Sequence, residues 1–351
     1  MQVKREFLGE APNHAPIYAY RLRNESGMEV RVTNFGAVIL NILVPDRDGK
    51  LVDVCLGQKD LQTYQTNPGC LGATVGPCAN RTANASFSIN GKKYFLEANK
   101  GVNNLHSSHV AGFQRTVWEE VSETEGEVVF HLRSADGEYG FPGNKDIHLS
   151  FSLSAENVLR LHYLVKSDAP TWINMTNHCY FNLGGHASGS VEGHEMQLFA
   201  SHFTPVREGS IPTGEIRSVL GTPFDFLHRR TIGEKMHEED DQLKEAGGGY
   251  DHNFCIDHAD GTLRMFADVS SEDTGIRMRA RTTLPGFQFY AGVQLDIPQG
   301  KQGAVYRPFD GFCLETQYFP NAINIENFES PITDSAHPYD TTTIYDFGGK
   351  E

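Results

Sequence analysis

Apolar and polar side chains alternate over residues 147–153, and this pattern constrains the fold more than any other feature of the sequence. Ile147, Leu149, Phe151 and Leu153 point to one side of an extended chain, while the histidine and serines between them point to the other. After a turn at AEN, the run LRLHYLV repeats the pattern. Two adjacent runs of this kind predict neighbouring antiparallel strands.

Similar strand signals continue along the chain. In SFSINGKKYFL, Asn90 and Gly91 separate two alternating runs, which is the signature of a tight hairpin with positive φ. Further strands are expected at VRVTNFGAVILNILV, EVVFHLRS, MQLFASHF, TLRMFADVS and FQFYAGVQL. Helical signals are sparse, and the best is the acidic run TIGEKMHEEDDQLKEA at 231–246, which three glycines follow.

These patterns favour an all-β protein, a large antiparallel β-sandwich with few short helices. A chain of 351 residues could hold one large β domain or two ordinary ones. Because no repeat, low-complexity tract or linker divides it, we expect residues 1–351 to form a single domain.

The composition indicates a protein that binds a small-molecule ligand and resides in a reducing compartment. A formal net charge of -15 argues against nucleic acid and anionic membranes as partners. The run MQVKREFLGEAPNHAP lacks the apolar stretch of a secretory signal, and no run of about 18 apolar residues follows it. We expect a cytoplasmic protein that is a monomer or a weak homodimer. Six scattered cysteines, none in a CxxC pair, are expected to be free thiols: Cys55, Cys70, Cys78, Cys179, Cys255 and Cys313.

His178 and Glu315 are the two strongest candidates for acid/base chemistry. Histidine titrates near neutrality, and burial can raise the pKa of a glutamate toward it. His178 stands in MTNHCYFNL beside an aromatic pair, and Glu315 follows the apolar run GFCL. The alternatives are a core histidine bonded to a backbone carbonyl and a glutamate on the solvated face of its strand. Burial of Gln317, on the same face as Glu315, would argue against the second.

Four further positions carry side chains suited to sugar hydroxyls. Asp251 follows three glycines and a tyrosine, and Arg81 offers a fork of hydrogen-bond donors. Asn80 in GPCANRT and Gln288 in PGFQFYAG are the other two. The alternative for Arg81 and Asp251 is an ion pair that only holds a loop.

His106 is a candidate because it stands in a polar segment, NNLHSS. His109 follows three residues later, and the spacing HSSH could suggest a metal site. A third ligand at a suitable spacing is absent, so we expect no metal.

Taken together and in order, these clusters resemble the aldose 1-epimerase (galactose mutarotase) family. The resemblance extends from about Val32 to Asn324, and its most specific stretches are TNHCYFNL, YDHNF and LETQYFPNAIN. Other matching stretches are GPCANRTANASFSINGKKYFLEANKGVNNLH, GEYGFPGN, IPTGEI, GTPFDF and PGFQFYAG.

The resemblance implies a galactose-mutarotase-like supersandwich that interconverts the α and β anomers of aldohexoses such as galactose and glucose, without a cofactor. It makes Glu315 the general base and His178 the general acid. For these roles we expect the glutamate to be ionised and the histidine charged near pH 7. Substrate-binding positions implied in the same way are Asn80, Arg81, His106, Asp251 and Gln288.

Some residues depart from the family pattern. Ser107 and Ser108 stand where glycines are usual, Pro77 where arginine is common, and Asn321 where aspartate is usual. These departures leave the preferred aldose open.

Two other functions stay open from the residues alone. Asp251 and Glu315 could be the paired carboxylates of a glycoside hydrolase. A non-catalytic carbohydrate-binding domain could use the same aromatic and polar side chains. A relative acting on a phosphorylated sugar is less favoured, because the motifs supply few positive side chains besides Arg81.

Overall fold

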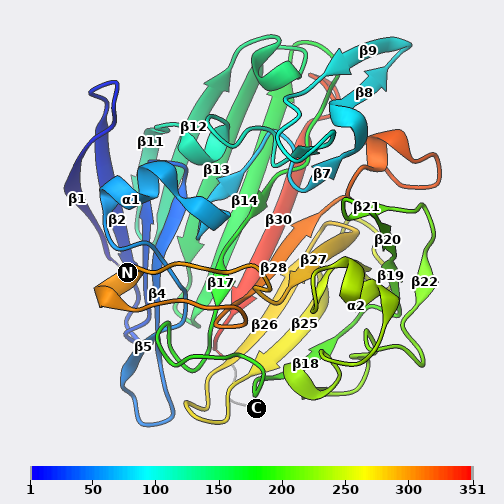
Figure 1. The fold of residues 1–351 in the computed structure, drawn as a ribbon. Coiled ribbons are helices and arrows are strands. Elements are labelled where there is room, and N and C mark those ends of the chain that lie inside the picture. Colours follow the sequence, from blue (N-terminus) through cyan, green and yellow to red (C-terminus); the bar gives the residue numbers. More distant parts are fainter. Residues whose placement is uncertain (1, 349–351) are drawn as a thin grey trace.

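The largest sheet of the protein has nine antiparallel strands. The computed structural model describes residues 2–348, which consist mainly of strands (Figure 1). The sheet order is β11-β12-β13-β14-β30-β26-β25-β18-β23. The strands are β11 (Glu119–Thr124), β12 (Glu127–Ser134), β13 (Lys145–Leu153), β14 (Val158–Ser167), β30 (Tyr339–Asp346), β26 (Arg277–Thr282), β25 (Arg264–Ser270), β18 (Glu195–Leu198) and β23 (Arg230–Thr231).

Two further sheets and five short pairs complete the strand framework. The five-stranded sheet holds β1 (Gln2–Glu10), β2 (Pro16–Arg23), β3 (Glu29–Thr33), β4 (Val38–Pro45) and β5 (Leu51–Asp53). The six-stranded sheet holds β17 (Tyr180–Phe181), β28 (Phe312–Gln317), β27 (Gly286–Tyr290), β24 (Asp251–Cys255), β19 (His202–Thr204) and β22 (Arg217–Ser218), in that order. The short pairs are β6 (Thr74–Val75) with β16 (Thr176–Asn177), β7 (Arg81–Thr82) with β10 (Asn104–Leu105), β8 (Ser86–Ile89) with β9 (Lys92–Phe95), β15 (Thr171–Trp172) with β29 (Ile332–Thr333), and β20 (Val206–Arg207) with β21 (Ile211–Pro212).

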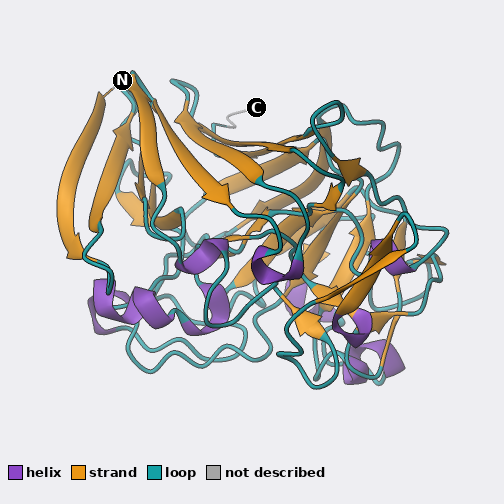
Figure 2. Cartoon of the chain, turned by 90° about the horizontal axis from the view of Figure 1, so that it is seen from above, coloured by secondary structure: helices purple, strands orange, loops and turns teal. Residues whose placement is uncertain are grey.

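Aromatic contacts join the nine-stranded sheet to both of the other large sheets. Phe130 of β12 meets Tyr20 of β2 with ring centroids 5.2 Å apart, and Phe266 of β25 meets Phe287 of β27 at 4.5 Å. All four rings are buried in one continuous apolar core. Figure 2 shows the resulting layers of curved strands, with the helices confined to short turns in the connections. The expected all-β sandwich with few short helices is confirmed.

The alternation over 147–153 is confirmed in β13. Its apolar side chains are buried, and those between them are exposed or half-buried. The strand pairs antiparallel with β14 along its whole length, as the two adjacent runs predict. The hairpin between β8 and β9 is also confirmed, with φ of 50° at Asn90 and 77° at Gly91.

The prediction of a helix over 231–246 is wrong for most of that segment. The segment begins with the end of β23, makes a 3₁₀ turn at Ile232–Glu234, and becomes helical only at α2 (Asp241–Glu245). The Asp240 side chain accepts hydrogen bonds from the backbone N–H groups of Gln242 and Leu243. This N-cap starts a new helix inside the acidic run, where the pattern suggested a continuous one.

The other helices are equally short. They are α1 (Leu61–Thr66) and the 3₁₀ turns Pro68–Cys70, Ala83–Ala85, Phe113–Arg115, Glu138–Gly140, Lys301–Gly303 and Ala322–Asn324. Within residues 2–348, no helix has the length and apolar character needed to cross a bilayer. All six cysteines are unpaired, as expected.

A buried ion pair anchors the segment that follows β27. The Lys301 Nζ atom lies 2.9 Å from Asp53 Oδ2 and donates to the Cys55 carbonyl at 2.6 Å. Removing one partner leaves a buried charge without compensation, which typically costs about 3 to 5 kcal/mol. We therefore expect Lys301→Ala to lower the free energy of unfolding by an amount in that range, measured by urea denaturation. Lys244→Ala is the control, because it removes an exposed pair with Glu239 and should leave the unfolding midpoint unchanged.

Candidate active site

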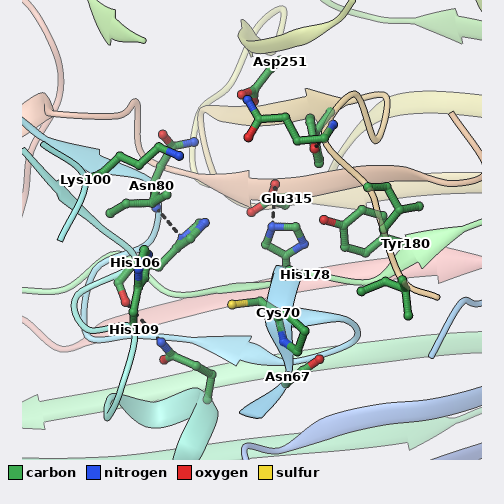
Figure 3. A pocket seen from close by; sticks show the side chains of 18 of the residues that line it. Asn67, Cys70, Asn80, Lys100, His106, His109, His178, Tyr180, Asp251 and Glu315 are labelled. Atoms are coloured by element: carbon green, nitrogen blue, oxygen red, sulfur yellow. Dashed lines mark hydrogen bonds and ion pairs between the residues drawn. The ribbon is translucent and has the colours of Figure 1, made fainter. Parts of the chain in front are cut away.

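A cavity of about 500 Å³ opens beside the six-stranded sheet and gathers most of the candidate residues (Figure 3). Strands β7, β24 and β28 contribute to its lining, together with the connections at 66–70 and 294–297. Six of the seven residues singled out from the sequence line it: Asn80, Arg81, His106, His178, Asp251 and Glu315. Its volume lies within the range of ordinary small-molecule sites.

Glu315 is buried within β28, where all six residues are buried. The residue is 3% exposed, and Gln317 on the same face is buried as well. This burial excludes the alternative of a glutamate on a solvated face. Glu315 Oε1 lies 3.7 Å from His178 Nε2, while Glu315 Oε2 has no hydrogen-bond partner among the described residues. A buried carboxylate oxygen without a partner is costly unless a ligand satisfies it.

His178 lies between β16 and β17, and its backbone fixes its position. Its N–H donates to the Ala73 carbonyl at 2.8 Å, and its ring stacks on Tyr180 with centroids 5.0 Å apart. The ring Nδ1 lies 3.5 Å from the Cys313 Sγ atom, and Nε2 faces Glu315. The ring nitrogens therefore face the Cys313 thiol and the Glu315 carboxylate.

Burial moves the pKa values of this pair in opposite directions. It raises the pKa of Glu315 to about 8, with the Asp251 charge adding to the rise and Arg81 opposing it. It lowers the pKa of His178 to about 4. Both shifts favour the neutral forms, because charge is disfavoured away from water. Near pH 7 these directions favour a single shared proton on Glu315, whereas the charged pair expected for catalysis places that proton on His178.

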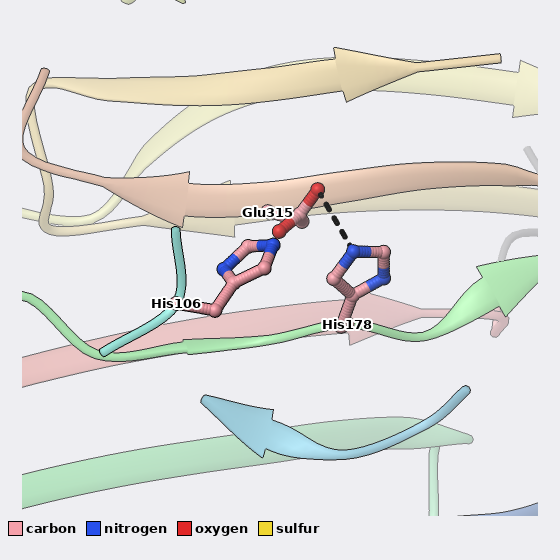
Figure 4. A group of neighbouring side chains, drawn as sticks. All are labelled: His106, His178 and Glu315. Carbon is pink, nitrogen blue, oxygen red and sulfur yellow. Dashed lines mark ion pairs between the residues drawn. The ribbon is translucent and has the colours of Figure 1, made fainter. Parts of the chain in front are cut away.

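His106 presents a hydrogen-bond donor to the cavity. Its Nδ1 accepts from the Asn80 backbone N–H at 3.1 Å, so the proton of the neutral ring lies on Nε2. Burial and the nearby His178 lower the pKa of His106 well below its usual value, which keeps the ring neutral. Figure 4 shows the His106 and His178 rings turned toward the Glu315 carboxylate.

These three side chains could also hold a metal ion, because their ligand atoms all lie within 4.8 Å of one another. Two imidazoles and a carboxylate form a donor set that zinc uses. His109, the partner suggested by the HSSH spacing, lines the cavity but lies outside this group.

Asp251 lies in a network of side chains at one wall of the cavity. Arg81 Nη2 lies 3.5 Å from Asp251 Oδ2, and Gln288 Nε2 donates to Asp251 Oδ1 at 2.7 Å. The ion pair of the alternative interpretation is therefore present, with both partners lining the cavity. Gln288 does not line the cavity; its hydrogen bond to Asp251 connects it to the residues that do.

Several lining residues were missed in the sequence. Tyr290 lies two residues after Gln288 on the same strand, so period-two alternation could have indicated it. Lys100 and Arg115 add positive charge to the cavity beyond Arg81, although few such side chains were expected there. Lys100 comes from a connection and Arg115 from the 3₁₀ turn Phe113–Arg115, and neither segment carries a periodic signal in the sequence. Other missed lining residues are Asn67, Cys70, Gln294 and Asp296.

A model of the family described as aldose 1-epimerase matches residues 18–346. The chain belongs to the aldose 1-epimerase family. It is 34% identical to the aldose 1-epimerase of Escherichia coli (strain K12) over 339 residues, which cover 96% of this chain and 97% of that protein. It is 36% identical to the galactose mutarotase of Sus scrofa over 349 residues, 99% of each chain. A crystal structure of an aldose epimerase homologue from C. elegans has a TM-score of 0.84 at 27% identity and covers 98% of both chains.

The residues that depart from the family pattern do not line the cavity. Ser107 has a φ of 63°, the region that glycine favours, and its hydroxyl donates to the Cys78 carbonyl at 2.9 Å. The Ser108 hydroxyl donates to Glu97 Oε2 at 2.7 Å. Asn321 Oδ1 accepts from the Ala83 backbone N–H at 3.0 Å. None of these three side chains, nor Pro77, lines the cavity.

Proposed function

We propose that this member of the aldose 1-epimerase family interconverts the α and β anomers of aldohexoses such as galactose and glucose by acid/base ring opening, with Glu315 and His178 as the proton-transfer pair. The observation that carries the proposal is the buried Glu315 carboxylate. One oxygen faces His178 across 3.7 Å, and the other has no hydrogen-bond partner among the described residues. A hexose in the cavity, with its anomeric hydroxyl against Glu315 and its ring oxygen against His178, would satisfy both groups.

The reaction needs one base and one acid at opposite ends of the hemiacetal. Glu315 takes the proton of the anomeric hydroxyl while His178 gives a proton to the ring oxygen, and the bond between the anomeric carbon and that oxygen breaks. Rotation of the free aldehyde about its bond to C2 exposes its other face. Closure reverses both proton transfers and yields the opposite anomer, so the enzyme regains its starting protonation.

The neutral pair that burial favours contains the same number of protons as the charged pair that starts this reaction. It therefore equals the state of the enzyme when the sugar is open. Substrate hydroxyls replace lost hydration around the two groups, which favours the transfer of the shared proton from Glu315 to His178.

Surrounding residues would orient the sugar. We propose that Asn80, Arg81 and Asp251 contact its hydroxyls, and that the His106 Nε2–H donates to the ring oxygen. Gln288 acts through Asp251 as a positioning residue, because it holds that carboxylate at 2.7 Å without reaching the cavity.

The direct test is anomer exchange on freshly dissolved sugars. We expect the purified protein to accelerate the optical-rotation decay of α-D-galactose or α-D-glucose above the uncatalysed rate. Binding without acceleration would indicate a carbohydrate-binding domain, and release of the aglycone from an aryl glycoside would indicate a hydrolase. A hexose phosphate belongs in the same assay, since Lys100 and Arg115 also line the cavity.

The pH dependence of kcat/KM is expected to be bell-shaped, with limbs near about 4 and about 8. Below the lower value His178 is protonated as well as Glu315, so neither group can act as the base. Above the upper value Glu315 loses the last proton, so no acid remains. Initial rates measured across this range, with the uncatalysed rate subtracted at each pH, check the expectation. A rate that stays flat from pH 3 to pH 10 would contradict the shared-proton pair.

Asp251→Ala is expected to lower kcat/KM by about 10- to 100-fold, the loss that follows removal of hydrogen bonds to a charged group. The Asp251 charge also raises the pKa of Glu315, so the basic limb should move to lower pH. Asp251→Asn separates the two effects, because it keeps an acceptor and removes the charge. Unchanged kinetics on several sugars would remove Asp251 from the proposed site.

We also propose that the substrate is the main partner, and that the protein acts in the cytoplasm as a monomer or weak homodimer. Six unpaired cysteines support a reducing compartment.

A further inference from the structure

A second group of histidine and carboxylate side chains lies on the nine-stranded sheet, outside the cavity. His131 of β12 and His148 of β13 are direct partners in the antiparallel register of two neighbouring strands (Figure 1). Their ring centroids are 4.7 Å apart, so the two imidazoles lie side by side on one face of the sheet. Asp146 precedes His148 by two residues and therefore points to the same face.

The distances within this group are those of a metal-binding set. Asp146 Oδ1 lies 3.0 Å from His131 Nε2 and 3.3 Å from His148 Nδ1. The three ligand atoms all lie within 4.8 Å of one another. Nitrogen and oxygen ligands of tetrahedral zinc, each about 2.1 Å from the metal, are about 3.4 Å apart. A zinc ion could therefore take these ligands with small side-chain movements.

One of the three proposed ligands is buried in the sheet, and the other two are open to solvent. The His131 side chain is 9% exposed, whereas those of His148 and Asp146 are 43% and 52% exposed. His131 is thus held in the sheet, and solvent can supply the remaining ligand positions. Glu119 Oε2 on β11 lies 3.7 Å from His131 Nδ1, the ring atom turned away from Asp146. Metal-bound histidines commonly direct their second ring nitrogen to a carboxylate of this kind.

We propose that His131, His148 and Asp146 form a surface site for a divalent transition-metal ion of the Zn²⁺ class, which cross-links β12 and β13 independently of the epimerase activity. The ligand atoms, two imidazole nitrogens and one carboxylate oxygen, argue for this class over Mg²⁺ or Ca²⁺. Arg133 and Lys166 stand opposite Asp146 on its two neighbouring strands and weaken the pull of its single charge. Imidazole nitrogens bind transition metals, while Mg²⁺ and Ca²⁺ depend on oxygen ligands.

The test is Zn²⁺ titration of the full chain after treatment with a chelator, by calorimetry and by the shift of the melting temperature. His148→Gln and Asp146→Asn change exposed side chains and should fold normally. Loss of a residue that only contacts a metal ligand weakens metal binding by about 10- to 100-fold. Each of these variants removes a ligand itself, so each should weaken Zn²⁺ binding at least that much. The rate of anomer exchange should stay unchanged in both variants. Mg²⁺ at the same concentrations should produce no shift.

His162→Gln is the matched control. His162 on β14 pairs with Asp340 at 2.8 Å but lies outside the group, so its loss should leave Zn²⁺ binding intact. His106→Asn separates this site from the cavity, whose own three candidate ligands include His106. The proposal fails if the chain binds no Zn²⁺, if His148→Gln keeps the affinity and stoichiometry of the parent, or if His106→Asn alone abolishes binding.

Discussion

Replacing Glu315 with glutamine is expected to slow anomer exchange by about 10²- to 10⁴-fold, the usual contribution of one proton-transfer group. Glutamine keeps the shape of the side chain and its place in β28, but it cannot take the proton of the anomeric hydroxyl. The remaining rate would depend on His178 as an acid. Because burial lowers the pKa of His178 to about 4, that rate should rise as the pH falls through this value. Optical-rotation decay of α-D-galactose from pH 3 to pH 10 measures both effects.

The control for this variant is Asp296→Asn. Asp296 lines the same cavity, but its residue is exposed, so its substitution removes a carboxylate without touching the proposed pair. We expect near-normal rates from it and, for both variants, melting temperatures close to that of the parent. A folded Glu315→Gln variant that retained the parental rate would show that another group is the base.

The sequence predicted the sheet but not the environment of Glu315. Alternation gives the two faces of a strand without saying whether either one faces solvent. In β28 both faces are covered, since all six of its residues are buried. The covering comes from the packing of distant segments, which no local pattern encodes. For the same reason the pKa directions of the pair could not be read from the residues.

Local sequence patterns also could not predict that the side chains of His178 and Glu315 lie close together. The two residues are far apart in the chain, and the resemblance to a family, not the spacing, predicted that they act together. The helix prediction failed because the N-cap at Asp240 starts the helix at Asp241, and not at Thr231 as the pattern suggested. Lys100 and Arg115 reach the cavity from a connection and a 3₁₀ turn, where no periodicity marks an inward-facing side chain.

His178→Asn is expected to lower the rate by a similar factor, about 10²- to 10⁴-fold, because asparagine cannot protonate the ring oxygen. The pH dependence should then differ from that of the glutamine variant. The remaining rate would require ionised Glu315, so it should rise with pH through about 8, where the parent loses activity.

His109→Asn is the matched control for this variant, since His109 lines the cavity without joining the group of His106, His178 and Glu315. It should keep the parental rate and the bell-shaped profile. Opposite pH trends in the two catalytic variants would be hard to obtain from damage to the fold, because damage lowers the rate without reversing the sign of its dependence on protons. A falling rate above about pH 8 in His178→Asn would therefore contradict the assignment of Glu315 as the base.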